Sequence, residues 1–256
     1  MRLRQLLILS RRSILGTLRQ PEALFPSLFF PLLFAALSTA AFQRATRLPG
    51  FPKVHSFLDF QLAATVIQGV LFGATTGGND MALDIQDGFF DRLVASPVSR
   101  SFILVGRLAG TAVQGAVQAT VFMAILVAFG ARIEGGLASA AAIVVIAAVL
   151  ALAIGGAGVT LALRTGSTEA VQASFPVFFI SLFVSSAFFP RKFMHGWFKT
   201  VAGINPLSWM VESVRHLVII GFDVTSAAKA LLIVGALGVF TISLAGAALR
   251  ARVRAA

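Results

Sequence analysis

Six apolar segments, each long enough to cross a bilayer as a helix, limit most strongly what this chain can fold into. A helix rises about 1.5 Å per residue, so about 20 residues cross a hydrocarbon core of about 30 Å. The segments that meet this requirement are 24–42, 58–77, 102–130, 137–163, 173–189 and 227–249. Inside a bilayer the backbone must satisfy its own hydrogen bonds. The sequence therefore predicts an all-α membrane protein with six transmembrane helices in one domain, residues 1–256.

The composition supports a lipid bilayer as the environment. Of 256 residues, 57% are hydrophobic and 12% are charged, whereas a soluble domain carries about 25% charged residues. The net charge of +11 does not indicate nucleic-acid binding, because the basic residues lie between and beside the apolar segments rather than on one face of a soluble fold. The absence of cysteine excludes a disulfide framework and a thiolate metal site.

The basic residues also predict the topology. Six spans place both termini on the same side of the membrane. With the N-terminus inside, 12 of the 21 Lys and Arg residues fall on the cytoplasmic side, and the two chain ends carry this excess. We therefore predict cytoplasmic N- and C-termini.

Residues 1–20 are predicted to form an amphipathic helix that lies in the plane of the membrane interface. Leu3, Leu7, Ile14 and Leu18 share one helical stripe, with the arginines largely off it. Such a basic amphipathic helix lies against anionic headgroups, and it could also touch a cytoplasmic partner. The alternative is a short basic flank that only sets the topology.

Residues 190–225 are too polar for a full span and too apolar for a solvated loop. The pair Asn205-Pro206 breaks any helix that crosses it. Trp197 and Trp209 suit the interfacial depth of a bilayer. We predict two short re-entrant half-helices in the outer leaflet, between the fifth and sixth spans.

Residues 79–100 contain four of the ten acidic residues. Spacings of four, three and four put Asp80, Asp84, Asp87 and Asp91 on one helical face. Like charges at these spacings repel, so a basic or hydrogen-bonding group is expected to offset them.

An apolar stripe accompanies these acids. It consists of Met81, Ile85, Phe89 and Leu93, and Gly88 is expected to break the helix. A solvated loop is one interpretation of the segment. Two adjacent phenylalanines, Phe89 and Phe90, favour docking to a partner protein or to the membrane surface instead.

The stretch 84–110 resembles the signature of the ABC type-2 permease family, which includes membrane subunits of daunorubicin-resistance-type drug exporters and of polysaccharide and lipid exporters. The matching residues are Asp87, Gly88, Phe89, Phe90, Asp91, Arg92, Leu93, Ser96, Pro97, Ser99, Arg100, Leu104, Gly106 and Arg107. A second match, to the family's Asn-Pro-Leu motif, consists of Asn205, Pro206, Leu207, Glu212 and Arg215. Asp84 and Asp87 depart from the family, whose members commonly carry Glu there.

The resemblance implies a permease that dimerises with a second copy and pairs with separate ATP-binding subunits. It would export an amphipathic drug, lipid or glycan across the bacterial plasma membrane. Residues 79–100 would be the cytoplasmic coupling loop that docks on the ATPase, and the stretch around Asn205 would form re-entrant helices that close the pathway. The coupling residues implied are Asp84, Asp87, Gly88, Phe89, Phe90, Asp91, Arg92, Leu93 and Arg100.

No ATP site is predicted on this chain. A P-loop requires G-x-x-x-x-G-K-[ST], and none of the four lysines follows a glycine. The three histidines form no H-E-x-x-H pair. We therefore predict no catalytic residue, metal or cofactor here, with ATP and Mg²⁺ in the partner subunit.

Two alternatives stay open. Gly69, Gly73 and Gly77 form successive G-x-x-x-G steps, which let another helix approach closely, either within the chain or across a dimer. The competing function is an ATP-independent secondary carrier or channel. The lack of an ionisable residue at mid-membrane depth counts against it.

Overall fold

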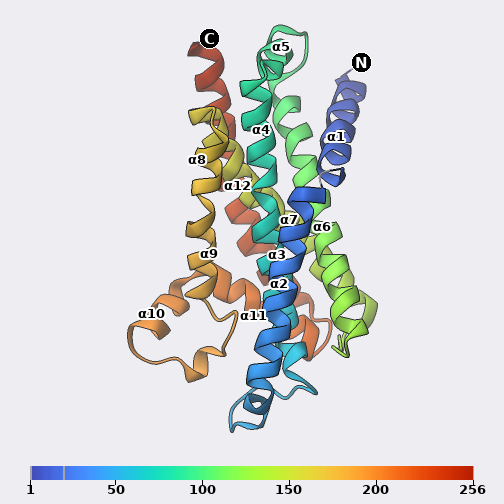
Figure 1. Cartoon of the computed structure of the whole chain (residues 1–256), viewed down its shortest axis with the longest axis vertical. Coiled ribbons are helices and arrows are strands. Elements are labelled where there is room, and N and C mark those ends of the chain that lie inside the picture. The colour runs from blue at the N-terminus through green and yellow to red at the C-terminus, as the bar shows by residue number, and fades with distance from the viewer. Residues whose placement is uncertain (1, 20, 256) are drawn as a thin grey trace.

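The computed structural model describes residues 2–19 and 21–255, and only the backbone at residues 2, 3, 6, 17, 18, 21–24, 74 and 255. Over these residues the chain is helical and contains no strand, and its long helices run side by side along one axis (Figure 1). The elements are α1 (Arg2–Leu18), α2 (Pro21–Phe42), η1 (Gln43–Arg47), α3 (Phe57–Ala74), α4 (Thr76–Gln86), α5 (Phe89–Ala95), α6 (Arg100–Ala128), α7 (Gly136–Thr165), α8 (Thr168–Ala173), α9 (Phe175–Phe183), η2 (Arg191–Phe193), α10 (Gly196–Ile204), α11 (Pro206–Ile219) and α12 (Val224–Ala255).

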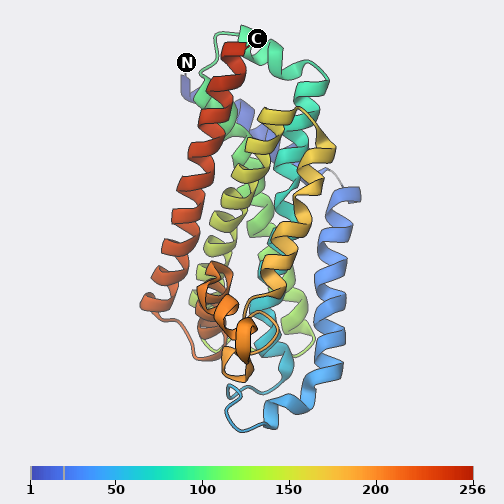
Figure 2. The same cartoon turned by 90° about the vertical axis from the view of Figure 1, so that its left-hand side faces the viewer.

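Five helical stretches in the described residues are long and apolar enough to cross a membrane: Phe25–Arg47, Phe57–Gln86, Arg100–Ala128, Gly136–Thr165 and Val224–Arg254. Five of the six predicted spans coincide with them. The chain is a multi-pass membrane protein with both termini and α5 at one end (Figures 1 and 2). We call this end the terminal end. The opposite end, which we call the far end, contains the α6–α7 turn, η1, α10 and α11.

The prediction of a continuous span over 173–189 was wrong. The structure has α8 and α9 there, and α9 ends at Phe183. Pro176 lacks the N–H that a continuous helix needs and clashes with the preceding turn. Residues 184–190 leave the helix altogether, and side chains from α11 hold their backbone, as described below.

The second span also extends further than predicted. Instead of ending at Gly77, the helical stretch is interrupted only at Thr75, whose backbone stays in the right-handed helical region, and continues as α4 to Gln86. Asp80 is therefore buried inside the bundle rather than exposed in a cytoplasmic loop.

Helix α3 is the centre of the bundle, and a glycine stripe formed by Gly69 and Gly73 of α3 and Gly77 of α4 faces α6 of the same chain. A Cβ atom added at Gly69 would overlap the ring of Phe122, and one at Gly73 would overlap the amide of Gln118. One at Gly77 would overlap the methyl group of Thr111. The three glycines thus set the close antiparallel approach of α3 and α6.

Replacing Gly69 by Ala is expected to destabilise the protein by about 2 kcal/mol, because Phe122 is fully buried and its ring has no space to move into. For a chain of this size the melting temperature should fall by about 5 °C. The measurement is a thermal unfolding curve of the purified protein in detergent. Gly235→Ala is the control, because no atom lies within 4 Å of an added Cβ there. Equal melting temperatures for the two variants would contradict the packing.

Helix α1 lies alongside α6 rather than across the ends of the spans (Figure 1). Leu9 sits against Gly106 and Ser13 against Gly110, so the two helices run in the same direction. Of the predicted apolar stripe, Leu7 is 60% exposed and Ile14 is partly buried, and the side chains of Leu3 and Leu18 lie outside the described residues.

Helix α12 starts at a capped N-terminus. The carboxylate of Asp223 accepts hydrogen bonds from the Ser226 hydroxyl and from the N–H groups of Ser226 and Thr225. These bonds, led by the one from the hydroxyl, hold the pKa of Asp223 below its ordinary value.

Candidate functional site

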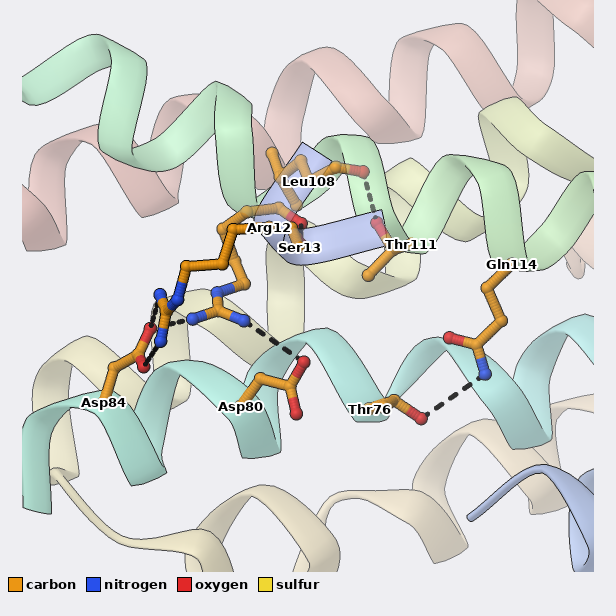
Figure 3. Close-up of polar contacts among 9 residues, drawn as sticks. Arg12, Ser13, Thr76, Asp80, Asp84, Leu108, Thr111 and Gln114 are labelled. Atoms are coloured by element: carbon orange, nitrogen blue, oxygen red, sulfur yellow. Dashed lines mark hydrogen bonds and ion pairs between the residues drawn. The ribbon is translucent and has the colours of Figure 1, made fainter. Parts of the chain in front are cut away.

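An ionic network joins α4 and α6 near the terminal end (Figure 3). Arg107 of α6 donates from Nη1 to Oδ2 of Asp80 at 3.1 Å, and its Nη2 pairs with Asp84. The side chains of Arg107 and Asp80 are about one-tenth exposed. Because the acids are four residues apart on α4, one guanidinium can reach both.

The network extends to α1 through Arg12. Its Nη2 lies 2.9 Å from Oδ1 of Asp84, and its guanidinium stacks on the ring of Phe89, 3.9 Å from the centroid. The hydroxyl of Ser13 donates to the carbonyl of Arg107 at 2.9 Å. Helices α1, α4, α5 and α6 are thereby tied together by charge and hydrogen bonds.

Gly88 separates α4 from α5, as the sequence predicted. Its φ of +66° lies in the left-handed region that glycine tolerates and most residues avoid. The chain turns there, and α5 lies across the terminal end (Figure 1). Phe90 of α5 is buried in an apolar cluster with Met81 and Leu104, so α5 is anchored by one aromatic side chain.

The expectation that four acids share one helical face was wrong. Asp80 and Asp84 point at Arg107, whereas Asp87 is exposed at the end of α4 and Asp91 is exposed beyond the break at Gly88. The expected basic partners are Arg12 and Arg107. The sequence contained a signal for them, since paired acids at a four-residue spacing require a cation, but spacing alone did not identify which arginines supply it.

The outward face of this end is polar and exposed. Asp91, Arg92 and Arg100 are exposed, and Phe89 and Leu93 are partly buried. Two further contacts hold the neighbouring helices: Gln86 donates to the carbonyl of Gly166 at 3.1 Å, and Arg252 to that of Leu163 at 3.0 Å.

At the far end, Asn205 and Arg215 hold the irregular backbone that follows α9. The Asn205 amide donates to the carbonyls of Ser181 and Val184 at 2.6 and 3.3 Å. The guanidinium of Arg215 is buried and donates to the carbonyls of Phe60, Ser186 and Ala187 at 3.2, 3.1 and 2.7 Å. Two residues of the second sequence motif thus supply hydrogen-bond donors to the backbone at and after the end of the apolar α9.

The rest of that motif lies on α11. Asn205 caps this helix by accepting from the N–H of Leu207 at 2.9 Å, and Pro206 occupies its first turn. Glu212 accepts two hydrogen bonds from Arg191, at 2.6 and 2.5 Å, and Arg191 stacks on Trp209. All five residues of the motif therefore belong to α11 or to its N-terminal cap.

An apolar cavity of about 670 Å³ lies between α2, α9 and the segment before α10. Most of its lining is aromatic: Phe34, Ser38, Phe42, Phe183, Ser185, Phe188, Phe189, Met194 and Phe198. Ion pairs of the far end do not reach into this lining. It suits an apolar or aromatic group.

The sequence profile of the family described as ABC-2 type transporter matches residues 4–219. The chain belongs to the ABC-2 type transporter family. Both motif regions, with the ionic network and the Asn205–Arg215 cluster, lie inside the matched range. The resemblance read from those motifs is confirmed.

Curated relatives include the daunorubicin resistance ABC transporter permease protein DrrB1 of Streptomyces coeruleorubidus, 25% identical over 209 residues, which are 80% of this chain and 72% of the relative. A putative transport permease ycf38 of Porphyra purpurea is 27% identical over 82% of this chain and 72% of its own length. A probable doxorubicin resistance permease, DrrC of Mycobacterium tuberculosis, is 28% identical over 57% of this chain and 54% of its own length.

Membership in this family makes the chain the permease of an ABC transporter, with ATP hydrolysis in a separate nucleotide-binding subunit. Permeases of this family typically carry no cofactor. Within the described residues, no group of three or more His, Asp or Glu side chains is placed to hold a metal ion.

Proposed function

We propose that this permease exports an amphipathic drug, lipid or glycan across a bacterial plasma membrane, as a homodimer driven by two ATPase subunits. The terminal end would be cytoplasmic. The observation that carries the proposal is the position of α5: it lies across the terminal end with exposed charged residues and is fixed to the spans through Arg12, Asp84 and Arg107.

The coupling surface in this proposal is the outward face of α5 together with the start of α6. Its contacts are Phe89, Asp91 and Arg92 of α5 and Arg100 of α6, with Asp87 and Gly88 at its hinge. A push by the ATPase on α5 would reach α6 by two routes. One is the packing of Phe90, and the other is the Asp84–Arg107 pair. Since Arg12 also binds Asp84, α1 would move with them.

The far end is proposed to be the outer gate. Helices α10 and α11 would be the re-entrant half-helices, with Asn205, Leu207, Glu212 and Arg215 holding them closed. The Phe-lined cavity beside them supports an amphipathic cargo with an apolar or aromatic part. The printed names of the relatives, which refer to daunorubicin and doxorubicin resistance, favour a drug within this class.

Exchanging Asp91 for Lys or Phe89 for Ala is expected to lower the amount of ATPase subunit that copurifies with the tagged permease about tenfold. Each change removes a proposed contact of α5, exposed at Asp91 and partly buried at Phe89, and loss of a single interface hot spot costs more than about 1 kcal/mol. The measurement is quantitative mass spectrometry of permease purified from its native host.

Lys199→Ala, an exposed charge change in α10 at the far end, is the control and should leave recovery unchanged. Normal recovery of the ATPase with both α5 variants, at normal membrane levels of permease, would refute the docking role. Transport by the permease alone in ATP-free proteoliposomes would instead favour the secondary carrier.

A further inference from the structure

A second polar site lies at the far end, where the segment before α3 meets the α6–α7 turn. Two adjoining cavities share His55, Arg132 and Glu134 as lining residues. The first, of about 460 Å³, is completed by Lys53, Val54, Asp59 and Ile219. It uses none of the residues of the two motifs.

Asp59 shapes this site, and its carboxylate is bonded to backbone N–H groups rather than to the cations of the site. Its carboxylate accepts hydrogen bonds from the backbone N–H groups of His55, Ser56 and Arg132 at 3.0, 3.1 and 2.8 Å. Asp59 is 3% exposed, and three N–H donors satisfy a buried carboxylate without a cation. The turn is thereby pinned to α3 through the backbone of Arg132, which leaves the guanidinium available.

Within the described part of the chain, the two cations of this site make no direct ion pair. Oε1 of Glu134 lies 3.5 Å from Nε2 of His55. Nη1 of Arg132 lies 3.4 Å from the same ring nitrogen. Among the side chains that the structure describes, neither Lys53 nor Arg132 has a carboxylate oxygen within 4.0 Å. The N–H donors of both cations therefore face the cavity with no described carboxylate in contact, which favours an anionic ligand.

The second cavity is an open apolar groove that starts at the same cations. Apart from His55, Arg132 and Glu134, it is lined by Val127, Ala131, Ile133, Gly136, Leu137 and Ala140. Leu137 is 87% exposed. The groove lies where α6 ends and α7 begins, the depth at which a bilayer changes from hydrocarbon to headgroups.

We propose that this site binds a phospholipid of the surrounding bilayer through its phosphate. Arg132 and Lys53 hold the phosphate oxygens, and an acyl chain lies in the groove along Val127 and Leu137. A planar guanidinium suits a phosphate because it offers two parallel N–H donors. The bound lipid fills the groove between the α6–α7 hairpin and the segment before α3, and it fastens the outer end of that hairpin.

The test uses the full-length permease purified in a mild detergent and mixed with phosphatidylglycerol or phosphatidylcholine of matched acyl chains. Native mass spectrometry counts the bound lipids. Phosphatidylglycerol should be retained in preference to phosphatidylcholine, whose choline cation opposes Lys53 and Arg132. In the double variant Lys53→Ala/Arg132→Ala, its retention should fall about twenty-five-fold, at about fivefold for each cation removed.

Arg44→Ala/Lys199→Ala is the matched control, because it removes two exposed cations of the far end that line neither cavity. It should retain phosphatidylglycerol as the unchanged protein does. The fold should survive in the test variant, since the bond from Arg132 to Asp59 comes from its backbone.

Glycerol 3-phosphate added in excess separates the two possible sources of phosphate. If the site holds a bilayer lipid, this soluble phosphate should displace little phosphatidylglycerol, because it lacks the acyl chain. Complete displacement would overturn the assignment to lipid in favour of a soluble phosphate ligand. Equal retention by the test and control variants would overturn the site itself.

Discussion

Replacing Arg215 by Met is expected to lower the melting temperature of the purified permease by about 10 °C. The guanidinium is the donor for the carbonyls of Ser186 and Ala187, which lie outside any helix. A buried carbonyl left without a donor costs about 1–3 kcal/mol, and the low dielectric around a membrane protein offers no water in compensation. Methionine restores the volume but not the donors. The unfolding curve in detergent measures the change.

Arg191→Met is the matched control. Arg191 sits at the same end and is also paired by two hydrogen bonds, but its side chain is about one-quarter exposed. Water can replace its contacts with Glu212, so its melting temperature should change by only about 2 °C. Arg215→Lys should lie between the two, because one ammonium cannot reach three carbonyls in different directions. A melting temperature of Arg215→Met equal to that of Arg191→Met would contradict the bracing role.

Replacing Arg107 by Ala is expected to have the second large effect, a loss of about 3–5 kcal/mol. The change removes the cation that lies between the nearly buried Asp80 and Asp84 and leaves Asp84 with the half-exposed Arg12. Breaking a buried pair by removing one partner costs this much. The melting temperature should fall by about 10 °C. ATPase stimulation by the permease should be lost as well, because α4 and α6 are no longer joined at the base of α5.

A neutral version of the network separates these two effects. The triple variant Asp80→Asn/Asp84→Asn/Arg107→Gln removes all three charges at once, so no buried carboxylate is left uncompensated. It should recover most of the melting temperature. The charge of Asp84 also holds Arg12 of α1. If coupling requires this contact, stimulation of the ATPase should stay low in the triple variant. Arg100→Ala, an exposed arginine at the start of α6, serves as the control for stability. A normal melting temperature for Arg107→Ala would show that Asp80 and Asp84 do not need their central cation.

The break at Gly88 and the start of α11 at Asn205-Pro206 were predictable because they follow from local chemistry. A glycine can adopt φ > 0, and a proline can occupy only the first turn of a helix. The same local argument failed for the fifth span. Hydropathy identifies the apolar residues 173–189. It does not show that the chain leaves the helix after Phe183, or that Arg215, 28 residues beyond Ala187, supplies the missing donors.

Charge partners were the other part that local reasoning did not reach. The acids at 80 and 84 required a cation, and the candidates along the chain were many. Arg107 is selected because Gly69, Gly73 and Gly77 bring α3 and α4 against α6 in one antiparallel register. Arg12 is selected because Leu9 and Ser13 fit against Gly106 and Gly110. Which arginine pairs with which acid depends in both cases on how closely the helices approach. Small residues permit a close approach, but they do not determine which helices make it.

The sequence by itself determined the membrane environment, five of the long apolar helices, the break at Gly88, the two short helices on either side of Asn205 and the family. Each depends on composition or on a property of neighbouring residues. The tertiary structure alone decided that Asp80 and Asp84 face inward to Arg107, that α1 runs beside α6, and that Arg215 braces the end of α9. These contacts join residues between 23 and 94 positions apart, at distances in sequence where hydrophobic periodicity carries no information.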